Sequence, residues 1–429
     1  MGSGSGCVDL GGASGAGPTL SAMTDHVGYL PRLKRRSESV DYLEGHPVPA
    51  AADIEHPDAG RKLVKTYMLE TAGSDRQIPD LASRFAGRVH LHRLDDTLFR
   101  VEDASHGGQV VGLIEELDDR HPVFYTKMAV EHSDRWVRQT VETSPWLDRL
   151  WLSSPILFEL WRQVKATTPP QRYARLGFEH EARYEPIDGL GTDIEDDGVD
   201  DADYETPSAF VERRRSVVTL TESLAVLEER LQRLIDSYDP LRSLVHLQMP
   251  AAGRGGHRLS YDGRATNRSD SFADHRATVR RVLALYRSVT EHAEHRLWVD
   301  TTDAGEDGFK IRGSPLVIDF GEPLSEPLFN RFVELALERR TSRFRIGGFV
   351  TRRGPTKAHV VAVDRHLWQP FLLEATSRHL LAVLPHGTCG NTVHRLVTNV
   401  QRELAPTARA WLGSEPYDKA VADAANIVA

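Results

Sequence analysis

KAHVVAVDRHLWQPFLLEATSRHLLAVLPHGTCGNTVHRLVTNVQREL, residues 357–404, combines short apolar runs with a longer periodic segment. Apolar runs this closely spaced are typical of an antiparallel meander. Residues 391–404 repeat Val and Leu at helical spacing and stop before Pro406, which predicts a helix. The strands that we predict for this C-terminal meander are residues 343–351, 357–364, 371–376 and 379–384.

A similar pattern occurs earlier in the chain. Short runs rich in Val, Leu, Ile and Phe alternate there with Asp and Gly pairs. A helical region at 131–165, broken by Pro145 and Pro155, follows these runs, and residues 173–184 return as a strand. The predicted strands of this first meander are residues 88–94, 97–102, 109–117 and 122–128.

An acidic run separates the two regions. Residues 188–205 read DGLGTDIEDDGVDDADYE and contain nine acidic residues and no basic one. Like charges without apolar anchors keep such a segment extended, so we predict a linker at 188–208. Crowded carboxylates that bind a divalent cation are the alternative interpretation.

The middle of the chain contains the most regular apolar spacing. Steps of three and four residues predict a helix over 217–238, closed by Pro240. This helix either packs as an ordinary core helix or forms a homodimer through a short coiled coil. Strands at 244–249 and 257–261 and a helix at 272–296 follow. The residues of the apolar seam are Val217, Leu220, Leu224, Leu227, Leu231, Leu234 and Tyr238.

These elements predict an α+β fold. It consists of two antiparallel meander-plus-helix units, separated by the acidic linker and a long amphipathic helix. A chain of 429 residues usually divides into two or three domains. The predicted division is a disordered tail (1–22), an N-terminal α+β domain (23–187), the linker (188–208), a helical and β middle region (209–300) and a C-terminal α+β domain (301–429).

Composition narrows the class of protein. Two cysteines among 429 residues provide no disulfide framework, and no apolar run has the length of a membrane span. We therefore expect a cytoplasmic protein that does not contact a membrane. The sequence contains no P-loop, dinucleotide glycine fingerprint, HExxH or GxSxG motif, so we expect no cofactor and no metal. A net charge of −9 argues against a surface that coats nucleic acid as a whole.

The turn before the last predicted helix is the best candidate for chemistry. A glycine-containing turn at a helix N-terminus directs free N–H groups and the positive end of the helix dipole toward its contents. We expect an open hollow for an anion there, and a cysteine with thiolate character at Cys389. The predicted ligand-binding residues of this turn are Gly387, Gly390, Asn391, Thr392 and His394.

Cys389 and Arg395 have the C-x5-R spacing, and over these seven residues the chain resembles the signature loop of cysteine-dependent phosphatases. The resemblance implies Cys389 as nucleophile, Arg395 as phosphate clamp and Asp364 as the acid. The apolar stripe of the helix instead places Arg395 on the opposite face, where a solvated arginine is expected. A thiol–imidazole pair of Cys389 with His386 or His394 is a further alternative.

A second candidate is the arginine-rich segment GRGGHRLSYDGRATNR, residues 253–268. Such a glycine-rich loop is suited to follow a phosphate backbone and to stack a base on Tyr261. Its predicted contacts are Arg254, Arg258, Arg264 and Arg268.

Two hypotheses follow from these candidates. The first is a non-catalytic binding or regulatory protein that recognises a phosphate-bearing ligand, either nucleic acid or a nucleotide. The alternative is a cysteine-dependent, phosphatase-like hydrolase.

Overall fold

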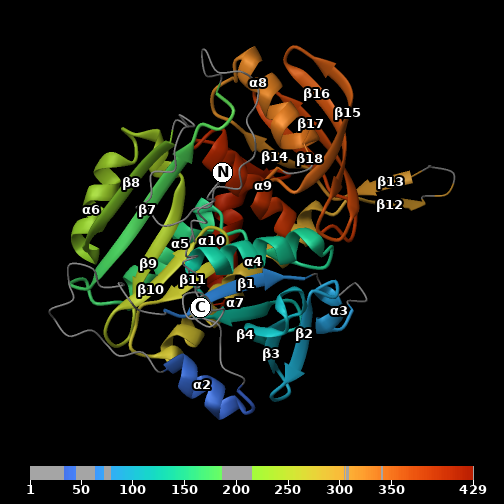
Figure 1. Ribbon diagram of the computed structural model, residues 1–429. Coiled ribbons are helices and arrows are strands. Elements are labelled where there is room, and N and C mark those ends of the chain that lie inside the picture. The colour runs from blue at the N-terminus through green and yellow to red at the C-terminus, as the bar shows by residue number, and fades with distance from the viewer. Residues whose placement is uncertain are drawn as a thin grey trace, which may run out of the picture.

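The computed structural model describes residues 33–44, 63–71, 79–185, 215–303, 305, 309–339 and 342–428. The predicted α+β class is confirmed, with two large antiparallel sheets (Figure 1). The predicted tail (1–22) and acidic linker (188–208) lie outside the described residues.

The first sheet contains strands from both sides of the predicted linker. Lys65 of β1 pairs with Thr266 of β11, and Tyr173 of β7 pairs with Ser223 of β8. The predicted regions 23–187 and 209–300 therefore share one sheet, while the domain boundaries themselves remain a prediction. In order of pairing, the strands are β2 (Val89–Arg93), β3 (Leu98–Asp103), β4 (Gln109–Glu116), β5 (Pro122–Thr126), β1 (Lys65–Glu70), β11 (Arg264–Asn267), β10 (Gly256–Ser260), β9 (Leu244–Pro250), β7 (Tyr173–Glu181) and β8 (Arg215–Ser223), and β6 (Asp148–Arg149) also pairs with β1.

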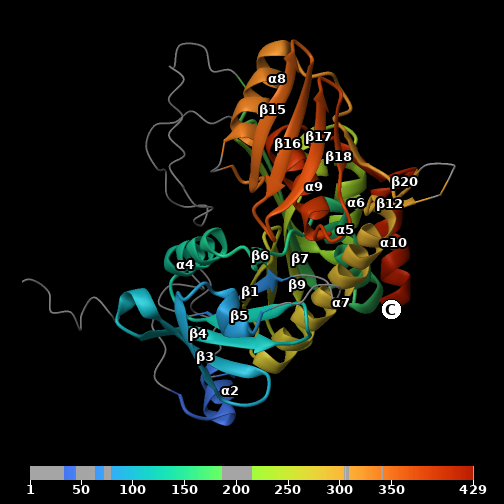
Figure 2. The same cartoon turned by 90° about the vertical axis from the view of Figure 1, so that its right-hand side faces the viewer.

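The second sheet contains the predicted C-terminal meander, which Figure 2 shows from its broad side. Buried and less buried residues alternate along β16, because one face of the sheet packs on the core. A π-helix, η5 (Val333–Glu338), continues α8 (Glu326–Phe332) and lies against β15. The strands in order of pairing are β15 (Ile346–Gly354), β16 (Lys357–Asp364), β17 (Gln369–Thr376), β18 (His379–Val383), β14 (Leu316–Asp319), β19 (Arg409–Leu412) and β20 (Glu415–Pro416), and a separate hairpin is formed by β12 (Asp300–Asp303) and β13 (Phe309–Arg312).

Two helices occupy the centre of the molecule, α7 (Phe272–Leu297) and α9 (Asn391–Glu403) (Figure 1). The Ser271 side chain accepts a hydrogen bond from the Asp274 N–H and caps α7. None of the helices in the described part of the chain combines the length and apolar character that a bilayer crossing demands. The other helices are α2 (Arg36–Glu44), α3 (Leu81–Arg84), α4 (Val130–Thr143), α5 (Ser154–Thr167), α6 (Leu224–Leu234) and α10 (Tyr417–Val428), with 3₁₀ turns η2 (Ala104–His106) and η3 (Asp239–Arg242).

The helix predicted over 217–238 is wrong in its first third. Residues 215–223 form strand β8, because this Val- and Thr-rich segment pairs along its whole length with β7. Only 224–234 are helical, as α6, and there Leu227 and Leu231 are buried in the protein's own core. The predicted homodimer loses its structural basis, because no helix spans residues 217–238.

A pair of neighbouring residues on α6 tests this packing. Leu227→Ala removes a fully buried side chain and should lower the free energy of unfolding by about 2–5 kcal/mol. Val226→Ala, at a position that is 38% exposed, should change it by less than about 0.5 kcal/mol. Urea denaturation and the solution mass of both variants are the measurements. Equal losses of stability, or a change of mass in Leu227→Ala, would contradict the core assignment.

Candidate functional site

The turn before α9 is buried and filled by the protein itself. Cys389 is 3% exposed, and the Trp298 indole N–H donates to the Thr388 carbonyl (2.6 Å). The Gly390 N–H donates to Glu294 Oε1 of α7 (2.8 Å). The expected open hollow for an external anion is therefore wrong, because the carboxylate of Glu294 already occupies the helix N-terminus.

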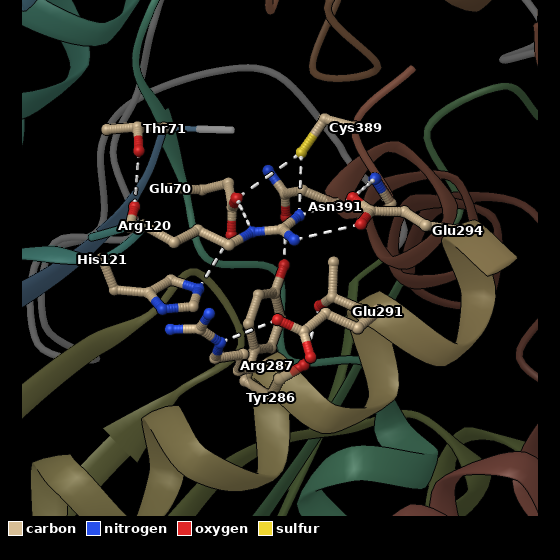
Figure 3. A network of polar contacts seen from close by, with 12 residues as sticks. Glu70, Thr71, Arg120, His121, Tyr286, Arg287, Glu291, Glu294, Cys389 and Asn391 are labelled. Atoms are coloured by element: carbon tan, nitrogen blue, oxygen red, sulfur yellow. Dashed lines mark hydrogen bonds and ion pairs between the residues drawn. The ribbon is translucent and has the colours of Figure 1, made fainter. Parts of the chain in front are cut away.

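Arg120 is the centre of the ionic cluster beside this turn (Figure 3). Its guanidinium donates to both oxygens of Glu294, at 2.6 and 3.1 Å, and to Glu70 Oε1 at 2.5 Å. Glu70 ends β1, Arg120 lies between β4 and β5, and Glu294 lies in the last turns of α7. The cluster thus holds together the first sheet, α7 and the turn that precedes α9. We call Glu70, Arg120, His121, Glu294 and Cys389 the Arg120 cluster.

His121 extends the cluster toward solvent. Its ring nitrogens lie 3.0 Å from Glu70 Oε2 and 3.0 Å from Asp118 Oδ2. Burial alone would lower the pKa of His121, but the two carboxylates raise it above its usual value. Burial would raise the pKa of Glu70, yet the charges of Arg120 and His121 lower it to about 2. Glu70 is therefore ionised near neutral pH, and His121 holds its proton more strongly than a free imidazole does.

The Cys389 thiol is protonated in this environment. Its Sγ lies 3.4 Å from Arg120 Nη2 and 3.5 Å from Glu70 Oε1. Burial, followed by the negative charge of Glu70, raises the pKa of Cys389 well above that of a free thiol. A nucleophilic thiolate needs the opposite environment, one that is electropositive and partly exposed.

Arg395 does not lie on a solvated face, so that expectation is wrong. Its side chain is fully buried and donates to Asp148 Oδ2 and, at 2.6 Å, to Asp364 Oδ1. The structure thus brings the predicted clamp and the predicted acid together as an ion pair. All thirteen residues of α9 are buried, because neighbouring elements surround the helix on its polar side as well. Both carboxylates raise the pKa of Arg395 against the effect of burial.

The remaining residues predicted in this turn also face inward. Asn391 Nδ2 donates to the Arg149 carbonyl (3.1 Å), and the Thr392 hydroxyl donates to Asp364. His394 lies between Thr290 of α7 and Tyr417 of α10, at 3.0 and 2.6 Å. Burial lowers the pKa of His394 to about 3, so its ring is neutral. Gly387 has a left-handed backbone (φ 86°), which explains the need for glycine at this position.

The arginine-rich segment is not a flexible loop, because residues 256–260 and 264–267 form β10 and β11 of the first sheet. Arg264 is buried and paired with Asp134. Arg258 and Arg268 are half-buried and have interaction partners, and Arg254 is exposed in the preceding turn. The four side chains therefore differ in exposure, and the buried ion pair of Arg264 with Asp134 removes that arginine from the predicted phosphate contacts.

An open pocket of about 700 Å³ lies elsewhere, between α5, α6, the end of α9, β19 and the start of α10. This volume is within the range of small-molecule sites. None of the site residues predicted from the sequence lines this pocket. The aromatic and cationic side chains of its wall are Phe158, Trp161, Trp411, Tyr417, Arg162, Lys165, Arg242 and Arg409.

Two polar groups of the pocket lack a partner among the described residues. Gln401 is 7% exposed and donates its Nε2 to the Ala408 carbonyl (3.0 Å), while its Oε1 has no hydrogen-bond partner. Arg409 is exposed and has no ion-pair partner in the part of the chain that the structure describes. By contrast, Lys165 is paired with Glu228 at 2.7 Å. A buried acceptor left without a donor is costly in a native protein and indicates a missing partner.

These features define an α+β protein with a closed ionic cluster at its centre and an open polar pocket at its periphery. The chain belongs to the MJECL33-like protein family, whose model matches residues 51–418. A relative from Methanocaldococcus jannaschii, "Uncharacterized protein MJECL33", is 28% identical over 144 residues. That match spans 34% of this chain and 33% of the relative, and no solved structure matches the chain.

The state of the thiol is directly measurable. Because burial raises its pKa, Cys389 should resist a thiol-specific reagent in the native protein at pH 7 and at pH 9, and react only as the protein unfolds. A Cys7→Ser background leaves Cys389 as the single thiol. Rapid labelling of the native protein at pH 7 would refute the closed site.

Proposed function

We propose that the protein is an intracellular, non-catalytic binding protein whose ligand carries phosphate and occupies the pocket beside α5, α6 and β19. This proposal rests on two polar groups of the pocket that lack a partner among the described residues. Within that part of the chain, the pocket combines a cation without an ion-pair partner, Arg409, with a buried acceptor without a hydrogen-bond donor, Gln401 Oε1. A phosphoryl group is the natural partner of an arginine fork, and a ligand amino group or hydroxyl is the natural donor to the amide oxygen.

The walls of the pocket favour a nucleotide among phosphate-bearing ligands. Phe158 and Trp411 are half-buried and line the pocket beside the polar groups. Flat aromatic side chains of this kind stack on a base, which every nucleotide provides. A mononucleotide also fits the volume better than a nucleic-acid strand, which needs a continuous groove.

The phosphatase-like alternative has less support from the geometry. Its nucleophile is a buried, protonated thiol, and its arginine is bound by Asp148 and Asp364. A phosphoryl group would have to displace two carboxylates from Arg395 in a fully buried space, which carries a large desolvation cost.

A titration tests the pocket. We expect ATP, ADP or AMP to bind the intact protein in a calorimeter, and Arg409→Gln to weaken that binding about tenfold to a hundredfold. A charge-assisted hydrogen bond of about 1.5–3 kcal/mol gives this factor. Higher salt should reduce the affinity of the native protein more than that of the variant.

Arg312→Gln is the matched control, because Arg312 is an exposed arginine on the separate β12–β13 hairpin. It should leave the dissociation constant unchanged. Absence of binding for all three nucleotides, or equal affinities of the Arg409→Gln and Arg312→Gln proteins, would refute the proposal.

A further inference from the structure

The outer face of the second sheet carries a row of exposed apolar side chains. Phe349 is 73% exposed, Val361 44% and Leu372 52%. They lie on adjacent strands in direct register, because Phe349 pairs with Val361 and Val361 pairs with Leu372. Figure 1 shows α8 and α9 on the other side of this sheet and no helix over this face. A continuous row of this kind marks an interaction surface more often than scattered apolar residues do.

A strained turn exposes a tryptophan beyond the ends of β16 and β17, a few residues along the strands from this row. Leu367 and Trp368 connect β16 to β17, and both have left-handed backbones, with φ of 65° and 52°. Such angles are unfavourable for residues other than glycine, and the turn holds the Trp368 side chain 62% exposed. The strained backbone does not bury the Trp368 side chain. Packing within the protein therefore does not explain the strain at this residue, which is consistent with a binding role.

A row of mixed charge lies next to the apolar one. Arg352, His359 and Glu374 are in register two residues further along β16 and β17. Lys357 pairs with Glu374 at 2.9 Å, whereas the exposed Arg352 has no ion-pair partner among the described residues. This exposed cation beside the apolar row favours a partner that carries a carboxylate there.

The size of the face decides which partner fits. Four strands about 4.8 Å apart and eight residues of about 3.3 Å give an area of about 500 Å². A stable dimer buries about 800 Å² per partner, so a second copy of the chain would need more surface than this face offers. A single amphipathic helix crosses the three strands of the row, about 10 Å between the outer two, with roughly seven residues.

We propose that this face binds an acidic amphipathic helix of a partner protein. The apolar stripe of the helix packs across Phe349, Val361 and Leu372, with Trp368 at its edge, and its flanking carboxylates pair with Arg352. This is the helix-in-groove mode of recognition applied to an exposed sheet. The proposal rests on a different surface from the nucleotide pocket and stands independently of it.

Selection from a displayed library tests the proposal. The library consists of 18-residue peptides with a fixed helical leucine stripe and random residues elsewhere, and the full-length protein is the bait. We expect the enriched peptides to be rich in Asp and Glu and to bind the native protein at least tenfold more tightly than the Leu372→Asp protein. Ile311→Asp, at a position 73% exposed on the separate hairpin, should bind like the native protein.

Trp368→Gly separates binding from stability. It removes the side chain and supplies the residue that the left-handed angle favours, so binding should fall while the unfolding midpoint stays or rises. Enrichment of basic or uncharged peptides, no enrichment, or affinity unaffected by Leu372→Asp would overturn the proposal. Tighter binding of an 18-nucleotide oligothymidine than of any peptide would assign the face to single-stranded nucleic acid instead.

Discussion

The complete burial of α9 is the constraint on which the rest of the structure depends. A charged side chain without water must be paired and hydrogen-bonded, or its burial is prohibitively costly. Arg395 meets this requirement through Asp148 and Asp364, and Arg402 through Glu179 of β7 at 3.0 Å. These carboxylates belong to the first sheet and to the second, so the pairing requirement of one helix determines how the two sheets are placed.

The same need to pair buried charges also closes the turn before α9, which the sequence indicated as the best candidate for chemistry. Before α9 begins, the Gly390 N–H and Arg120 both bind Glu294, and the Cys389 thiol lies among these groups as a neutral member. Charged groups that would serve catalysis in an open cleft here hold packed elements together. At the periphery, Arg409 of the pocket and Arg352 of the exposed sheet face are cations without an ion-pair partner among the described residues.

Local patterns predicted the elements of the fold well. The C-terminal meander and the helices α7 and α9 follow from apolar spacing. The segment 215–223 was mistaken for helix because apolar residues in an alternating strand also fall at some helical positions, and its pairing with β7 decided the outcome. The strand β11 was missed because RATN offers little apolar signal.

The candidate site was harder to predict from the sequence than the fold, because its contacts join residues that lie far apart along the chain. A helical stripe predicts one buried face only, so nothing around Arg395 in the sequence indicated the carboxylate of Asp148 from β6, and Asp364 of β16 was expected nearby only through the phosphatase resemblance. Glu294 lies 96 positions before Gly390, too far for a motif to reveal their contact. The pocket likewise collects residues from α5 to α10.

The most direct test of the central claim is the stability of an Arg395→Met protein in urea at pH 7, compared with Arg233→Met at a largely exposed position of α6. If the buried pairing of α9 organises the fold, Arg395→Met leaves Asp364 unpaired and lowers the free energy of unfolding by about 3–5 kcal/mol, while Arg233→Met changes it by less than about 0.5 kcal/mol. Equal stability of the two variants would contradict the account.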